Sequence, residues 1–150
     1  MTTIQERLNW RATPDQYDKI RRLWIKHSIA EDKRDLQGLV DTMAEDAVYE
    51  IVSTGQRWEG HDAVRTFYTT FLGAFPDVKF SLNEIVIGPQ GVFEVADMVG
   101  THKGNWAGVE PSGRQTNFKV IIYFPWNPAA EKFSGEKIYM DRVDLMEQIG

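Results

Sequence analysis

The sequence GTHKGNWAGVEPSGR, residues 100–114, is the stretch that says most about the fold. Its glycines are typical of a connection, and long alternating patterns precede and follow it, so we expect it to join two strands of one sheet. His102 falls at the end of the first of these strands, where a rigid sheet can position a residue for chemistry. Because an imidazole titrates near neutral pH, the segment also marks a candidate site.

Alternation with a period of two extends in both directions from this segment. Long strands are predicted for 78–87, 92–103, 115–126 and 132–142, and a shorter strand for 47–53. In 115–126 the even positions from Phe118 to Phe124 are all apolar, which indicates the buried face. In 92–103 the odd positions look solvated, so His102 is expected to point inward with Met98, unless a β-bulge changes the register.

Helical periodicity is confined to the first half of the chain. Thr13, Pro14 and Gln16 form a helix start with a capping box, and apolar residues at three- and four-residue spacing continue to about Asp32. Two further helices are predicted for 35–43 and 62–73, with a loop at 53–60. Three helices followed by antiparallel strands predict a single α+β domain over residues 1–150, with the helices on one face of a curved sheet.

Composition and charge exclude several classes of partner. The net charge of −5 and the lack of a basic run argue against nucleic acid, which is bound through clustered Lys and Arg. No apolar run is long enough to span a bilayer, and residues 1–11 are too polar for a signal peptide, so no membrane partner is expected. With no cysteine the chain suits a reducing compartment, and we expect a cytoplasmic protein. Few histidines and carboxylates point inward, so neither a metal nor another cofactor is expected.

Three segments resemble the SnoaL-like polyketide cyclase group of the NTF2-like superfamily. They are MAEDAVYE at 43–50, GHDAV at 60–64 with FPD at 75–77, and residues 100–114 themselves, in which Ser112 stands where Thr is commoner. The end of the chain from 139 is also similar, so the resemblance spans about residues 15–150. It implies an NTF2-like cone, a curved antiparallel sheet wrapped around a pocket that three N-terminal helices close. The fold alone does not choose the reaction.

Members of this superfamily place different residues around the pocket. Cyclases of the group use an inward Asp as general acid/base with histidines nearby, whereas the strand at 115–126 carries no carboxylate. Epoxide hydrolases use an Arg flanked by two Asp, and Ala96, Met98 and Ile138 occupy those places here. Resemblance to scytalone-dehydratase-like members implies that Tyr49, His102 and Asp32 lie near the pocket.

Four residues are the candidate catalytic groups. His102 is either an inward acid/base or a histidine satisfied by backbone at a strand end, and His27 either faces the same cavity or lies at the edge of the core. Glu136 shares the parity of Ile138 and is the best remaining base, with a solvated position as the alternative. Tyr49 either donates a hydrogen bond to a substrate oxygen or packs at the rim of the pocket.

Inward parity and aromatic loop residues predict the walls of the pocket. The predicted substrate-binding residues are Trp24, Trp58, Met98, Trp106, Phe118, Val120, Ile122, Ile138 and Met140. Ordinary loop packing is the alternative for Trp58 and Trp106. Asp32, Asp97 and Asp141 are further candidates, and for the last two an outward or capping position is the alternative.

These residues predict a cofactor-independent enzyme of lyase, isomerase or cyclase type that acts on a small apolar carbonyl, aromatic or polyketide-like substrate. Aldol-type closure or cleavage, dehydration and isomerisation need the same parts, so the reaction stays open. The alternative is a non-catalytic small-molecule-binding or dimerisation module of the same fold. Under either interpretation an apolar outer sheet face predicts a homodimer, formed through Val95, Val99, Ile121, Tyr123, Phe133 and Tyr139.

Overall fold

Residues 2–150 are described by a computed structural model of the chain. The helices are α1 (Ile4–Leu8), α2 (Pro14–Asp32), α3 (Leu36–Val40), α4 (His61–Ala74) and α5 (Arg142–Ile149). The strands are β1 (Met43–Ile51), β2 (Gln56–Glu59), β3 (Lys79–Gly88), β4 (Gly91–Thr101), β5 (Gln115–Asn127) and β6 (Lys132–Met140). The predicted α+β architecture is confirmed, with the six strands in one open, curved sheet.

The sheet has the strand order β2-β1-β6-β5-β4-β3. β3, β4, β5 and β6 form the predicted antiparallel series, and β2 extends the opposite edge by pairing antiparallel to β1. One pairing differs from the expected antiparallel sheet, since β1 runs parallel to β6. The chain makes this parallel pair by passing through α4 and the four strands β2, β3, β4 and β5 before it returns beside β1.

Local sequence explains where the helices begin and end. The Thr13 hydroxyl accepts a hydrogen bond from the N–H of Gln16, whose side chain accepts one from the N–H of Thr13, so the predicted capping box starts α2. α3 is shorter than expected because β1 already begins at Met43. α1 and α5 were not predicted from the sequence. Neither helix has a long buried apolar face that would produce a helical pattern, because α1 buries no residue and α5 only two. Among residues 2–150 no helix is long and apolar enough to cross a membrane.

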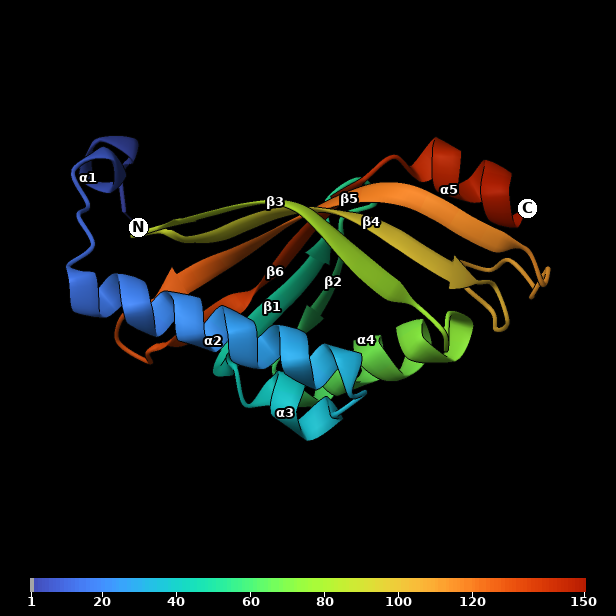
Figure 1. The fold of residues 1–150 in the computed structure, drawn as a ribbon, viewed down its shortest axis with the longest axis horizontal. Coiled ribbons are helices and arrows are strands. Elements are labelled where there is room, and N and C mark those ends of the chain that lie inside the picture. The colour runs from blue at the N-terminus through green and yellow to red at the C-terminus, as the bar shows by residue number, and fades with distance from the viewer. Residues whose placement is uncertain (1) are drawn as a thin grey trace.

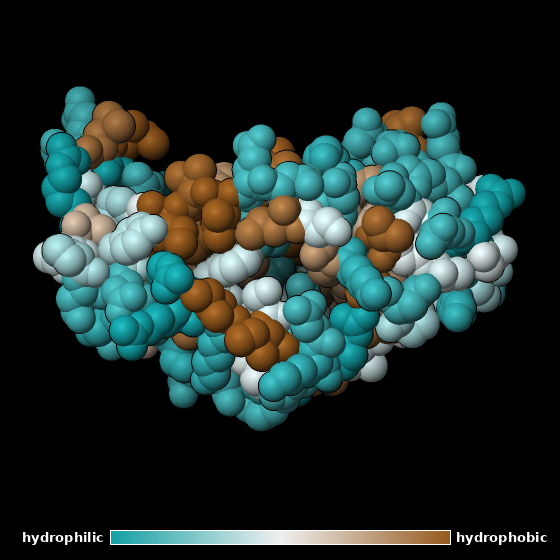
Figure 2. Space-filling view, in the orientation of Figure 1, coloured by the Kyte–Doolittle hydropathy of each residue, from teal (hydrophilic) through white to brown (hydrophobic). Residues whose placement is uncertain are grey.

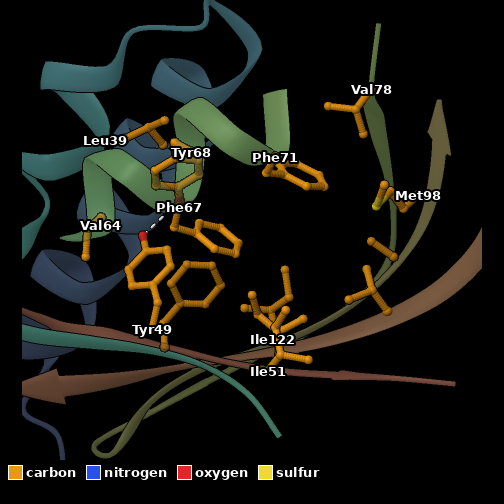
Figure 3. Close-up of a cluster of buried hydrophobic side chains, with 14 of the residues drawn as sticks. Leu39, Tyr49, Ile51, Val64, Phe67, Tyr68, Phe71, Val78, Met98 and Ile122 are labelled. Carbon is orange, nitrogen blue, oxygen red and sulfur yellow. Dashed lines mark hydrogen bonds between the residues drawn. The ribbon is translucent and has the colours of Figure 1, made fainter. Parts of the chain in front are cut away.

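The core lies between one face of the sheet and the helices α2, α3 and α4, which gather beneath the sheet in Figure 1. The even positions of β5 from Phe118 to Phe124 are all buried, as their parity predicts. Aromatic rings fill the centre, where Phe67 and Phe71 of α4 stack with centroids 5.9 Å apart and Tyr49 of β1 packs against Phe67 (Figure 3). The expected cone, closed on one side by three helices, is therefore present.

A bulge in β6 determines which of its residues face the core. Gly135 has a φ of 125°, and a Cβ at this position would overlap the backbone of Val48 on β1, so only glycine fits. Phe133 is buried before the bulge, and Glu136 and Ile138 are buried after it. The predicted outward position of Phe133 is therefore wrong, because strict alternation does not continue through the bulge.

Candidate functional site

Five polar side chains are buried together where α2 and α4 face β1 and β6. His27 comes from α2, Thr42 from the turn before β1, Tyr49 from β1, Tyr68 from α4 and Glu136 from β6. None of the five is more than 3% exposed, so they depend on one another for hydrogen bonds. We call these five residues the buried network. Sequence reasoning named three of them and missed the Thr and the α4 Tyr, neither of which interrupts an apolar pattern.

Hydrogen bonds connect the network as a chain. Tyr49 Oη lies 2.8 Å from Tyr68 Oη (Figure 3), and Tyr68 donates to Oε1 of Glu136 at 3.0 Å. Because the proton of Tyr68 is used in this bond, Tyr49 is the donor between the two phenols. His27 Nε2 lies 3.0 Å from the same Oε1 atom. Both bonds to Glu136 therefore fall on one oxygen, which leaves its Oε2 without a partner in the network.

Thr42 fixes the protonation of the histidine. Its hydroxyl donates to the backbone carbonyl of Leu39 at 2.7 Å, so the same oxygen accepts from Nδ1 of His27 at 2.9 Å. Nδ1 therefore carries a proton. When Nε2 is also protonated, His27 and Glu136 form an imidazolium–carboxylate pair.

Charge in the network is set by burial and by Glu136. Burial lowers the pKa of His27, whereas the hydrogen bond to Glu136 and the negative charges nearby raise it. Together the raising effects outweigh burial, so the pKa of His27 lies above its usual value. Burial and the same carboxylate raise the pKa of Tyr49 and Tyr68 well above that of a free phenol. Both tyrosines therefore remain neutral hydrogen-bond donors near neutral pH.

Two small cavities lie beside the network. The inner cavity, about 30 Å³, is lined by Tyr68 and Glu136 and by apolar side chains of β4, β5 and β6. The α2 cavity, about 40 Å³, lies between α2 and β4 and is lined by Trp24 and Glu94. Its mouth is the hollow between α2 and β3 in Figure 2. Glu31 lines both cavities, so the two are neighbouring parts of one interior site.

Two carboxyl groups of this site were missing from the sequence prediction. Glu94 of β4 is only 8% exposed and accepts a hydrogen bond from Trp24 Nε1 at 2.9 Å. It shares the inward parity of Met98, which is the signal that could have identified it. Glu31 is half-buried one helical turn after His27 on α2. Burial raises the pKa of Glu31 to about 8 and that of Glu94 to about 7.

His102 lies outside the buried network. It is fully buried, its ring stacks on Phe75 at 5.6 Å, and its Nδ1 accepts the N–H of Ser112 at 3.2 Å. The ring proton is therefore on Nε2, which has no hydrogen-bond partner within residues 2–150. His102 lines neither of the two cavities. These surroundings favour the alternative interpretation, a histidine held by backbone at a strand end.

The other predicted residues divide between the cavity walls and the surface. Met98, Trp106, Val120, Ile122, Ile138 and Met140 line the inner cavity, Trp24 lines the α2 cavity, and Phe118 is buried without lining either. Asp97 pairs with Lys119 at 2.7 Å, Asp141 caps α5, and Asp32 is exposed. These three carboxylates lie outside the network. In the described part of the chain, no group of three His, Asp or Glu side chains is arranged to hold a metal ion.

The fold and the enclosed acid/base network define an NTF2-like cone with an interior site. The chain is similar to AclR from Streptomyces galilaeus, described as a hydroxylase (TM-score 0.71, 19% identity, 87% of this chain and 80% of that chain). It is also similar to a protein from Jannaschia sp. CCS1 assigned to the SnoaL-like polyketide cyclases (TM-score 0.78, 18% identity, 94% of this chain and 97% of that chain). A third similar structure is IdmH from Streptomyces antibioticus, assigned as a polyketide cyclase (TM-score 0.69, 20% identity, 86% of this chain and 96% of that chain). At these identities the likeness shows the fold alone.

The family is shown by the sequence itself. The model of the SnoaL-like polyketide cyclase family matches residues 17–149, so the chain belongs to this family and the resemblance noted above is confirmed. No curated protein matches the chain by sequence. Membership supports a function of the cyclase type and leaves the reaction and the substrate open.

Proposed function

We propose that this protein is a cofactor-independent acid/base enzyme that moves a proton beside a carbonyl group of a small, largely apolar substrate. The observation that carries the proposal is the position of Glu136. Its two hydrogen bonds fall on Oε1, and the residue lines the inner cavity, so Oε2 is available to a substrate there. Because the cavity holds little water, electrostatic interactions between such a carboxylate and a substrate are strengthened.

The proposed reaction begins when Oε2 of Glu136 accepts a proton from the carbon beside the carbonyl. The electrons of the C–H bond form a carbon–carbon double bond, and the carbonyl oxygen takes the negative charge. Glu31 then donates its proton to that oxygen, which gives an enol. Glu31 suits this role because it lines the same cavity and its pKa of about 8 keeps it protonated at neutral pH. His27 and Tyr68 remain hydrogen-bonded to Glu136 and orient it.

The enol can complete more than one reaction. In aldol closure its carbon attacks a second carbonyl of the substrate, the enol proton returns to Glu31, and the new alkoxide takes the proton from Glu136. In the isomerisation of an unsaturated ketone, Glu136 instead gives its proton to the far carbon of the conjugated dienol, and the enol proton returns to Glu31. Family membership favours the closure, and the apolar walls of the inner cavity favour an aromatic or polyketide-like substrate.

Exchange of carbon-bound protons tests the first step without knowledge of the substrate. In deuterium oxide, we expect the protein to accelerate deuterium incorporation beside the carbonyl of cyclohexanone, followed by proton NMR. Glu136→Gln is expected to lower the catalysed rate roughly a hundredfold. The catalysed rate of the wild type is expected to decline as the pH rises through about 8, because Glu31 then loses its proton. Glu31→Gln is expected to abolish that decline.

A matched control separates the site from the rest of the chain. Glu84→Gln makes the same change on the exposed side of β3 and is expected to keep the wild-type rate. Wild-type exchange at the rate of buffer alone, or an unchanged rate in Glu136→Gln, contradicts the proposal. If the wild type binds cyclohexanone by calorimetry without accelerating exchange, the non-catalytic binding module becomes the better interpretation. Circular dichroism of each variant distinguishes loss of the site from loss of the fold.

A further inference from the structure

A third hollow, which we call the outer groove, lies directly outside the inner cavity. It has a volume of about 100 Å³ and is formed by the turn between β1 and β2, the loop after β4 and the start of α5. Trp58 supplies an apolar wall, and Ser53, Gln56, Thr70 and Arg142 supply polar groups. The groove therefore offers both stacking area and hydrogen-bonding groups beside the acid/base site.

Ile51, Trp106 and Met140 line both the outer groove and the inner cavity, so they form the partition between the two. The inner cavity, about 30 Å³, has room for only a few water molecules, so an aromatic substrate needs the partition to open. Trp106 belongs to the glycine-rich loop, where it exchanges two backbone hydrogen bonds with Val109, and the next residue, Ala107, has a φ of 52°. For a substrate to pass, this indole has to leave its edge-on contacts with Phe71 and Phe75, whose ring centroids lie 5.7 and 6.1 Å away.

The two spaces differ in the ionisable side chains that line them. Among the described residues, the inner cavity is lined by Glu31 and Glu136 and by no Lys or Arg, whereas the outer groove is lined by Arg142 and by no Asp or Glu. Within residues 2–150 the side chain of Arg142 makes no ion pair, although its helix begins with a capping Asp141. A guanidinium is well suited to a carboxylate, which it can hold through two parallel hydrogen bonds. An anionic group is therefore favoured in the groove and disfavoured in the inner cavity.

We propose that the outer groove is a second substrate subsite, in which Arg142 binds a carboxylate while the neutral carbonyl end of the same molecule reaches past Trp106 to Glu136. The substrate class is then an aromatic or polyketide-like keto acid. The inner half of this assignment rests on the proposed function. Binding of the carboxylate in the outer groove is independent of the proposed function.

Benzoate and its neutral analogue benzamide test the subsite by isothermal titration calorimetry with the whole chain. We expect the wild type to bind benzoate about tenfold more tightly than benzamide, because only benzoate forms a charge-assisted pair with the guanidinium. Arg142→Gln is expected to bring the ratio of the two affinities close to one. Arg21→Gln, the same change on the exposed face of α2, is expected to keep the wild-type ratio.

The orientation of the ligand has its own test. The test is made at about pH 9, where Glu31 has lost its proton. Since the carboxylate is expected to face away from Glu31, Glu31→Gln should leave the affinity for benzoate unchanged at this pH. Tighter binding of benzoate by Glu31→Gln would place the carboxylate in the inner cavity and overturn the proposal. Undetectable binding of benzoate to the wild type, no preference over benzamide, or an equal loss of both ligands in Arg142→Gln would overturn it as well.

The result can be separated from that of the proposed function because calorimetry requires no turnover. A protein that shows the benzoate preference and its loss in Arg142→Gln, but does not exchange the protons of cyclohexanone, has the subsite without the enzyme. A protein that exchanges these protons but lacks the preference has the acid/base site without a carboxylate subsite.

Discussion

The hydroxyl of Thr42 determines how His27 can act. It accepts the Nδ1 proton, while Nε2 faces Glu136, so both ring nitrogens are used inside the network. An imidazole held in this way does not need to contact a substrate to be useful. It fixes the position of the Glu136 carboxylate and offsets its charge, as the orienting partner of a general base does. His27 is therefore a positioning residue in the proposed reaction.

Glu94 makes the stability of the fold depend on pH. Burial raises the pKa of its carboxyl from 4.5 to about 7, so between these values the folded state holds a proton that the unfolded state releases. Stability from this group therefore falls as the pH rises through the window. Glu94→Gln removes the charge, and its amide oxygen can still accept the N–H of Trp24. We expect a gain in the free energy of unfolding on the order of 1–3 kcal/mol above about pH 8, and little below about pH 4.5.

Urea denaturation at the two pH values measures this gain. The control is Glu45→Gln, in which an exposed carboxylate is exchanged in the same way and the free energy of unfolding should change little at either pH. A gain of equal size at both pH values would mean that packing of the amide, rather than removal of a buried charge, stabilises the variant.

Among the elements, alternation predicted most of the sheet because each long strand has one buried face. β4 and β5 keep their predicted parity from end to end. The prediction fails where the chain leaves the two-residue period, as at the Gly135 bulge that turns Phe133 inward. β2 could not be predicted from alternation either, because Trp58 is its one apolar residue and the strand depends on its pairing with β1.

The candidate site was predictable to the extent that its members interrupt apolar faces. His27 and Glu136 do so, and both could be named from the sequence. Tyr68 resembles an ordinary core aromatic on α4, and Thr42 an ordinary turn residue, so only the packing of four elements reveals that they join the network. His102 stands out in the sequence, but its Nδ1 accepts the backbone N–H of Ser112, a local contact that spacing along the chain cannot predict.

Gly135 is the residue on which the geometry of β6 depends. In Gly135→Ala the Cβ would meet the backbone of Val48, and the φ of 125° is strained for any other residue. We expect a loss of at least about 3 kcal/mol in the free energy of unfolding, measured by urea denaturation. Because Glu136 follows the bulge directly, any folded fraction should also lose the catalysed exchange of protons.

Gly88→Ala is the matched control at the end of β3. A Cβ at this position has no neighbouring atom within 4 Å and the backbone is not left-handed, so a change within about 1 kcal/mol is expected. Similar stabilities of the two alanine variants would show that the bulge can relax, and that Gly135 does not set the orientation of β6.

At the scale of the whole molecule, the two faces of the sheet have different surroundings. One face is covered by α2, α3 and α4 and encloses the site (Figure 1), while the other exposes Phe93, Ile121 and Tyr139 at 46%, 40% and 40%. Ile121 pairs with Val95 of β4 on one side and with Tyr139 of β6 on the other, so an apolar row crosses three strands. An exposed apolar face of this kind favours association of two copies through a two-fold interface.

Ile121→Glu tests the predicted homodimer, because a two-fold interface across this row would bring two buried carboxylates into an apolar contact. We expect the wild type to sediment as a dimer and Ile121→Glu as a folded monomer in analytical ultracentrifugation. Val143→Glu makes a similar exchange on the exposed side of α5, where the residue is 67% exposed, and should remain dimeric. A monomeric wild type, or an Ile121→Glu variant that still dimerises, would mean that copies of this chain do not associate through the outer sheet face.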